Sequence, residues 1–220
     1  MPTCTGGIWT VAYSPDSKLL ASGGVDKTIR LWDASTGHLV RELGGHGEDV
    51  RCVAFSPDGK TLASIDRRRK SLRLWNVATG ERLAVSNDGG ESLAFSPNGR
   101  LLAVASGYGT GDASVVRVRN AESLRLESRI AGIKHKAHVV TFAADSRRIA
   151  VGTAFPGTAE LWDVVDMKRI AFLDPNYEFI SGLVFIDEKT IAVTGRGMSW
   201  PPILLWDISN PGLLPEYDPD

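Results

Sequence analysis

The sequence predicts an all-β fold, a propeller of five four-stranded blades. Three observations lead to this prediction: a repeat with a period of 43 or 44 residues, short segments that alternate apolar and polar residues, and turn residues between those segments. The period is clearest in the aligned positions Trp32, Trp75, Arg119, Trp162 and Trp206, which are separated by 43, 44, 43 and 44 residues. A regular period of this size is typical of repeat architectures.

Each period has the same internal order. In the first, strands are expected over residues 9–13, 19–22, 28–32 and 38–43, with turns rich in Pro, Asp, Ser and Gly between them. One such sheet cannot bury both of its faces, but five in series bury them by packing around an axis. We therefore expect a single domain over residues 1–220, with blades at 8–43, 50–86, 91–132, 137–174 and 180–217.

Composition fits an ordinary globular chain and argues against several functional classes. The 220 residues are 43% hydrophobic and 23% charged, and the net charge is -1, which argues against nucleic acid and acidic membranes as partners. No apolar run reaches the roughly 18 residues that a membrane span needs. The N-terminus does not resemble a Sec signal, and the two cysteines, Cys4 and Cys52, exclude a disulfide scaffold. We expect a cytoplasmic protein.

The recurring motifs resemble the WD40-repeat family. Phe-Ser-Pro-Asp-Gly at 55–59 is followed by Leu-Ala-Ser, by Leu-Trp-Asn and by Thr-Gly, and variants of this order cover roughly Ile8 to Trp206. The resemblance implies the propeller fold and a role in protein binding.

The family signature joins a His, a strand Ser or Thr, a turn Asp and the Trp by hydrogen bonds. This chain matches it in part, and the resemblance implies structural roles for Ser22, Asp26, Trp32, His46, Ser64, Trp75, Trp162 and Trp206. Cys4 stands where the first repeat would have its His, and Arg69 stands where the second would have its turn Asp. We therefore expect no repeat to have the full set.

The resemblance implies seven blades as the commonest number, and five periods are present. Three arrangements stay open: a small closed ring, an open arc, and part of a longer protein. Residues 213–217 would supply a fourth strand for the fifth blade, at an edge because of Pro215. An arc would expose apolar sheet faces and so allow self-association through its open edges.

Candidate binding residues lie in the turns between the second and third strands. These turns are irregular, whereas the Ser-Pro-Asp-Gly and Thr-Gly turns are short and uniform. Arginine offers forked hydrogen bonds and aromatic residues offer contact area at low entropic cost. The candidates are Arg67, Arg68, Arg69, Tyr108, Phe155, Arg196 and Trp200.

Each candidate also has a plain structural interpretation. The run of residues 67–70 is typical of a solvated hairpin tip, and Trp200 before two prolines would cap a core. The Gly-rich segment at 107–111 lacks the Lys and the helix of a phosphate-binding loop. His135 and His138 are three residues apart, which places them on opposite faces of a strand and argues against a metal site.

The sequence therefore predicts a non-catalytic scaffold that presents one rim to a protein or peptide partner, without a cofactor or metal. Two alternatives are kept. The first is a propeller hydrolase or lyase with carboxylates or His at the central axis. The second is a regulatory WD40 segment of a larger multidomain protein.

Overall fold

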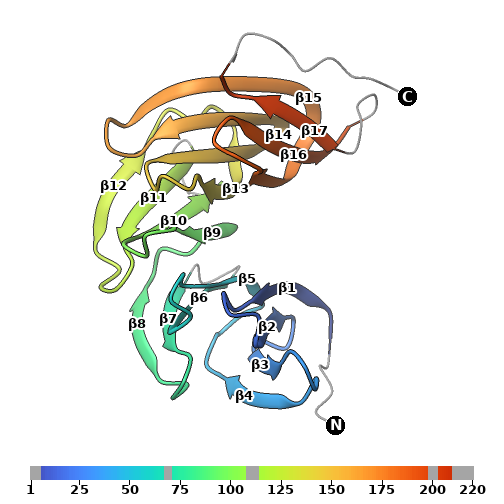
Figure 1. The fold of residues 1–220 in the computed structure, drawn as a ribbon, viewed down its shortest axis with the longest axis vertical. Helices are drawn as coiled ribbons and strands as arrows, with labels where there is room; N and C mark the ends of the chain where they lie inside the picture. The colour runs from blue at the N-terminus through green and yellow to red at the C-terminus, as the bar shows by residue number, and fades with distance from the viewer. Residues whose placement is uncertain (1–5, 67–70, 108–113, 198–202, 210–220) are drawn as a thin grey trace. The chain divides into compact units, whose positions relative to one another are not determined.

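The computed structural model describes residues 6–66, 71–107, 114–197 and 203–209, and its regular elements there are seventeen β-strands (Figure 1). The first sheet has the order β1-β2-β3-β4. Its strands are β1 Ile8–Tyr13, β2 Leu19–Gly24, β3 Ile29–Asp33 and β4 Leu39–Leu43. The prediction of an all-β chain built from small antiparallel sheets is confirmed.

The second and third sheets repeat this order. The second, β5-β6-β7-β8, consists of Val50–Phe55, Thr61–Asp66, Leu72–Asn76 and Arg82–Ser86. The third, β9-β10-β11-β12, consists of Ser92–Phe95, Leu101–Ser106, Val115–Asn120 and Leu126–Ile130. Arg119, which replaces the repeat Trp, is buried, donates to the Leu124 carbonyl at 2.6 Å and forms an ion pair with Asp88.

The fourth and fifth periods form one sheet of five strands, β13-β14-β15-β16-β17, so the prediction of five four-stranded blades is wrong. The strands are β13 Lys136–Phe142, β14 Arg148–Asp163, β15 Lys168–Phe185, β16 Thr190–Arg196 and β17 Ile203–Asp207. The reason lies in β15, which stays paired to β14 through Gly157↔Tyr177 and Ala154↔Phe179, so no turn separates the two periods. The expected strand at 213–217 lies outside the described residues.

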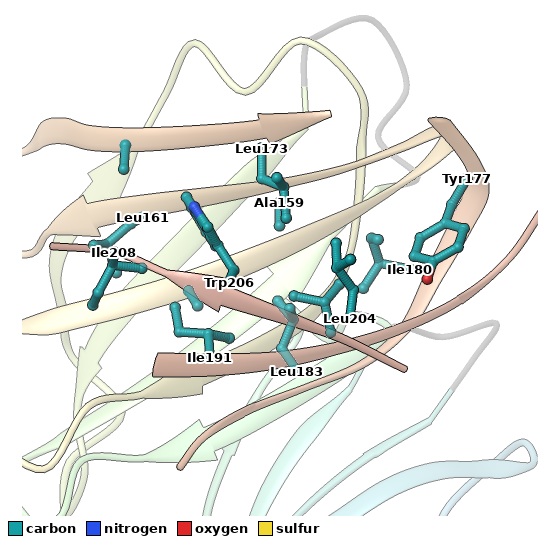
Figure 2. Packing of buried hydrophobic residues seen from close by; sticks show 13 residues of the cluster. Ala159, Leu161, Leu173, Tyr177, Ile180, Leu183, Ile191, Leu204, Trp206 and Ile208 are labelled. Atoms are coloured by element: carbon teal, nitrogen blue, oxygen red, sulfur yellow. The ribbon is translucent and has the colours of Figure 1, made fainter. Parts of the chain in front are cut away.

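The chain divides into two compact units, Met1–Val104 with Arg119–Arg125, and Ala105–Val118 with Leu126–Asp220. In the first unit, one buried cluster joins the first and second sheets, and another joins the second sheet to Leu93, Leu102 and Val104. In the second unit, thirteen buried residues form a cluster around Trp206 (Figure 2). The cores therefore lie between successive repeats, as a stack of sheets requires.

The Ser-Pro-Asp-Gly turns are fixed by their own side chains. Ser56 Oγ donates to Asp58 Oδ1 at 2.6 Å and accepts from the Thr61 amide at 3.0 Å. The hydrogen bond from Ser56 is the main cause of a lowered pKa at Asp58. Gly59 closes the turn at a φ of 70°, a conformation that favours glycine.

Across the described residues, no helix is long and apolar enough to cross a membrane.

Candidate functional site

Four side chains around the second sheet form one buried hydrogen-bonded network. The Trp75 indole N–H donates to Ser64 Oγ at 2.8 Å, and Ser64 Oγ lies 2.7 Å from His46 Nε2. On the other side of the ring, His46 Nδ1 lies 3.1 Å from Asp66 Oδ2. The single Ser64 proton points to Nε2, so Nδ1 carries the ring proton and donates to Asp66.

The expectation that no repeat has the full set is therefore wrong. The second repeat completes it with Asp66, at the end of β6, instead of a residue from the following turn. Ser64 and Asp66 are two residues apart and so share one face of the strand. A search for Asp at the turn position alone misses this carboxylate, whereas a search for Ser-x-Asp along the second strand would have found it.

Burial and hydrogen bonding set the charges in the network. Desolvation lowers the pKa of His46, with the hydrogen bond to Asp66 opposing it. Desolvation alone would raise the pKa of Asp66, but hydrogen bonds from Ser71 and His46 lower it overall. Ser71 Oγ donates to Asp66 Oδ2 at 2.5 Å and the Ser71 amide donates to Oδ1 at 3.1 Å. Near neutral pH the ring is neutral and the carboxylate is ionised.

The order Ser64–His46–Asp66 is the order of groups in a serine hydrolase. Here, however, the side chains of all three residues are buried, and the Ser64 oxygen already accepts the Trp75 indole proton. A substrate carbonyl has no route to this oxygen, so the arrangement stabilises the sheet. Among the described residues, no group of three or more His, Cys, Asp or Glu could hold a metal ion.

The first repeat contains part of an equivalent network. The Trp32 indole donates to Ser22 Oγ at 2.8 Å. Asp26, which matches the family's turn Asp, forms an ion pair with Arg30 and accepts the Thr28 amide at 3.3 Å.

The fourth and fifth repeats lack the strand serine, and their tryptophans differ. The Trp162 indole donates to Glu160 Oε2 at 2.9 Å, two residues earlier on β14. The Trp206 indole N–H is fully buried and has no acceptor among the described residues. Trp162 and Trp206 are both core residues.

Five of the seven predicted binding residues, Arg67, Arg68, Arg69, Tyr108 and Trp200, lie outside the described residues. Phe155 and Arg196 lie in the second unit, Phe155 in the middle of β14 and Arg196 at the end of β16, and both strands pair with β15. The register places Ala154 opposite Phe179 and Phe179 opposite Arg196. Because both pair with Phe179, the residue before Phe155 and Arg196 itself lie on either side of the same residue of β15.

Phe155 occupies the tip of a hairpin within β14. Its side chain is 66% exposed and its φ is 53°, in the left-handed region that bulky residues seldom adopt. Beneath it, Thr153 Oγ1 donates to the Pro156 carbonyl at 2.9 Å and accepts the Thr158 amide at 2.9 Å. Both threonines are buried, so the hairpin that displays Phe155 is held from inside.

An aromatic surface forms around this tip; we define it as Phe155, Phe179, His138 and Arg196. The rings of Phe155 and Phe179 have centroids 6.3 Å apart, and His138 meets Phe179 edge-on at 5.9 Å. Arg196 Nε lies 3.9 Å from Glu178 Oε2, and both side chains are solvent-exposed. Such an exposed pair contributes little to stability, which leaves the guanidinium able to bind another carboxylate.

Two glycines allow the strands of this surface to approach closely. A Cβ on Gly157 would lie 2.7 Å from the Phe179 backbone, and a Cβ on Gly195 would lie 2.6 Å from the Tyr177 ring. Neither position tolerates a side chain without movement of the strands. The sequence showed these glycines only as turn residues.

The structure also places a hollow where the sequence indicated only turns. A groove of about 860 Å³ in the first unit lies between the turns at Pro15 and Pro57, and is lined by Leu19, Val40 and Arg41. Arg41 is held at its edge by hydrogen bonds to the carbonyls of residues 78 and 79. Because these turns have similar residues in each repeat, the sequence alone did not indicate a groove between them.

Comparison with known proteins agrees with the repeat pattern. The family model described as "WD domain, G-beta repeat" matches residues 2–33 and 37–76. The chain therefore contains WD40 repeats in this segment. The antiparallel sheets, the cores between repeats and the hydrogen bonds of Trp32, Trp75 and Trp162 agree with an all-β WD40 propeller fold.

Several curated proteins resemble this chain. WD repeat-containing protein AAC3 of Dictyostelium discoideum is 27% identical over 75% of this chain and 35% of its own length. The guanine nucleotide-binding protein subunit beta of Solanum tuberosum is 40% identical over 46% of this chain and 29% of its own length. Apoptotic protease-activating factor 1 of Rattus norvegicus is 34% identical over 48% of this chain and 9% of its own length. The chain thus spans about a third or less of these relatives.

Proposed function

We propose that this chain is a non-catalytic interaction module that binds a protein or peptide partner. WD40-repeat proteins generally act as scaffolds for protein interactions. The observation that carries the proposal for this chain is the aromatic surface: an exposed Phe155 on a hairpin pinned from inside, beside Phe179 and Arg196.

The chemistry of the aromatic surface indicates what the partner offers. Phe155 and Phe179 supply an apolar contact from two tilted rings, which suits an aliphatic or aromatic side chain. Arg196, the register partner of Phe179, supplies a forked donor, which suits a carboxylate. We expect a segment in which an apolar residue lies next to an acidic one.

Peptide selection from a random display library tests this proposal. Wild type should enrich a motif that combines an apolar and an acidic residue. The double variant Phe155→Ala, Arg196→Glu should lose that motif. Val165→Ala, which trims another exposed apolar side chain of the same unit, is the matched control and should keep it. The same motif on the double variant, or no enrichment on wild type, would contradict the proposal.

We propose a cytoplasmic location for this module. The chain has only two cysteines, Cys4 and Cys52, and Cys52 is a free thiol, which suits a reducing compartment. Fractionation of cells that express the tagged chain would test this, and recovery from a secreted fraction would contradict it.

A role as a regulatory segment of a larger multidomain protein is the second proposal. It is favoured by relatives such as NACHT domain- and WD repeat-containing protein 1 of Homo sapiens, which is 34% identical over 43% of this chain and 6% of its own length. Sequencing of the native transcript would test it, and a reading frame confined to these 220 residues would contradict it.

A further inference from the structure

The groove of about 860 Å³ is formed by the first and second sheets, which both belong to the first unit. Three turns and two strands line it. The turns are those at 14–16, 57–60 and 76–78, and β2 and β4 contribute Leu19, Val40 and Arg41. The groove therefore lies at a junction that the chain itself completes, with one repeat on each side.

The side chains that line the groove are largely apolar, with Leu19 and Val77 among them. A second hollow, of about 650 Å³, lies one repeat further along and is lined by equivalent turns of the same unit. At the repeat positions of Leu19 and Val77 this hollow has Thr61 and Ala121, and polar residues make up most of its lining. An apolar lining is therefore particular to the first groove and is not a property of every junction.

The charges at the groove are not balanced. Asp16 Oδ2 lies 3.8 Å from Lys18 Nζ, and Lys60 lies close enough to Asp58 for its charge to act on that carboxylate. Each acidic residue of the lining therefore has a lysine beside it. Arg41, in contrast, forms no ion pair with any carboxylate in the part of the chain that the structure describes. Its charge is left without a counter-charge at the edge of an apolar groove.

The guanidinium of Arg41 also has hydrogen-bond donors to spare. It donates to the carbonyls of Thr79 at 3.0 Å and Ala78 at 2.8 Å, which hold it in place but carry only partial charges. Its Nε is buried and has no acceptor within the described ranges. A planar guanidinium suits a carboxylate, which would neutralise it. Ala84 occupies the repeat position of Arg41, so the second hollow has no equivalent of this cation.

We propose that the groove binds the C-terminus of a partner protein whose last residue is aliphatic. Leu19, Val40 and Val77 contact the aliphatic side chain. Arg41 binds the terminal carboxylate, a group that proteins recognise as a chain end. A C-terminal residue carries both groups on one Cα, as a compact groove with one cation requires. Because turns border the groove, a chain end, which needs one exit, fits it better than an internal segment, which needs two.

A library of random peptides with free C-termini tests the proposal on the full chain. Wild type should enrich Leu, Ile or Val at the last position. Val40→Glu places a carboxylate in the lining, which repels the incoming carboxylate, and should lose the enrichment. Leu83→Glu is the matched control and should keep it. Leu83 has the repeat position of Val40, is 53% exposed where Val40 is 51% exposed, and does not line the groove.

One selected peptide, made as the free acid and as the C-terminal amide, tests the role of Arg41. On wild type, fluorescence polarisation should give a Kd at least about tenfold weaker for the amide, because a charged hydrogen-bonded contact is lost. Arg41→Gln should bind acid and amide equally. Arg41→Lys keeps the charge and should keep a preference for the acid. Comparison of two peptides on one variant cancels any general loss of stability.

The proposal would be overturned if wild type enriched no aliphatic last residue, or if Val40→Glu enriched it as well as wild type does. Loss of the enrichment on Leu83→Glu would overturn it too. A preference for the acid that Arg41→Gln retains would rule out Arg41 as the carboxylate-binding group. The aromatic surface lies in the second unit, and none of these variants changes it, so either proposal can fail while the other holds.

Discussion

Ser64 accepts the indole proton of Trp75 at 2.8 Å, in a position where both side chains are buried. The same hydroxyl serves His46, so one oxygen connects two strands and a loop. Hydrogen bonds of this kind contribute modestly when made but are costly to leave unmade inside a core.

Ser64→Ala should lower the free energy of unfolding by about 2–4 kcal/mol, because it leaves the Trp75 N–H and His46 Nε2 without partners. Urea denaturation followed by circular dichroism measures this. Ser22→Ala, which removes one bond to the half-buried Trp32, should cost only about 1 kcal/mol. Equal losses for the two variants would show that the His46 network adds nothing.

Val193→Thr should leave the free energy of unfolding almost unchanged. Val193 follows Ile191, the register partner of Trp206, by two residues, as Ser64 follows Leu62, the partner of Trp75. A hydroxyl there would accept the Trp206 indole proton and so offset its own desolvation. Val151→Thr is the control, because Trp162 already donates to Glu160, and it should cost about 1–3 kcal/mol. Equal losses of unfolding free energy for Val193→Thr and Val151→Thr would contradict the assignment of Val193 to the repeat position of Ser64.

Stability should fall as the pH is lowered from 6.5 towards 5. Burial lowers the pKa of His46 from 6.5, so the unfolded chain binds a proton that the folded chain does not. The stability that this group contributes is therefore present above pH 6.5 and is lost below it, by up to about 1.4 kcal/mol per pH unit. Asp66 acts separately, because its lowered pKa matters only below pH 3.8.

Thermal melts at pH 7.5, 6.5 and 5.5 measure this slope. His46→Gln should melt at a lower temperature than wild type but show a flatter dependence on pH. If His46→Gln shows the same dependence of melting temperature on pH as wild type, groups other than His46 cause that dependence.

The sequence predicted the class of fold well because its signals are local. The 43- or 44-residue period, the Pro-Asp-Gly turns and the buried Trp75, Trp162 and Trp206 are each readable within one repeat. It failed for the five-stranded sheet, because whether β15 turns or continues depends on pairing with β14 across the fold. It also missed Asp66, because the carboxylate comes from a strand end.

The binding role of Phe155 and Arg196 stays a prediction, and part of their surroundings can be inferred from the sequence. Residue type and loop position indicate both residues, and the register of three strands places their neighbourhoods together. The sequence does not indicate Phe179 or His138, because nothing in a single repeat shows that β15 places an aromatic side chain beside the hairpin tip. Their contribution depends on pairing between distant segments.

Gly157→Ala should destabilise the second unit and alter the aromatic surface, because the new Cβ would lie 2.7 Å from the Phe179 backbone. We expect a loss of about 1–3 kcal/mol by urea denaturation. Gly44→Ala is the control, since a Cβ there meets nothing within 4 Å. If both variants unfold at the same urea concentration as wild type, the close approach of the hairpin to β15 is not rigid.

The affinity of a selected peptide tests the account most directly. Fluorescence polarisation would give the Kd of one labelled peptide for wild type, Phe155→Ala and the control Val165→Ala. Because a central aromatic contact contributes about 1.5–2 kcal/mol, the account predicts a Kd at least about tenfold weaker for Phe155→Ala and an unchanged Kd for Val165→Ala. Equal affinity for wild type and Phe155→Ala would contradict it.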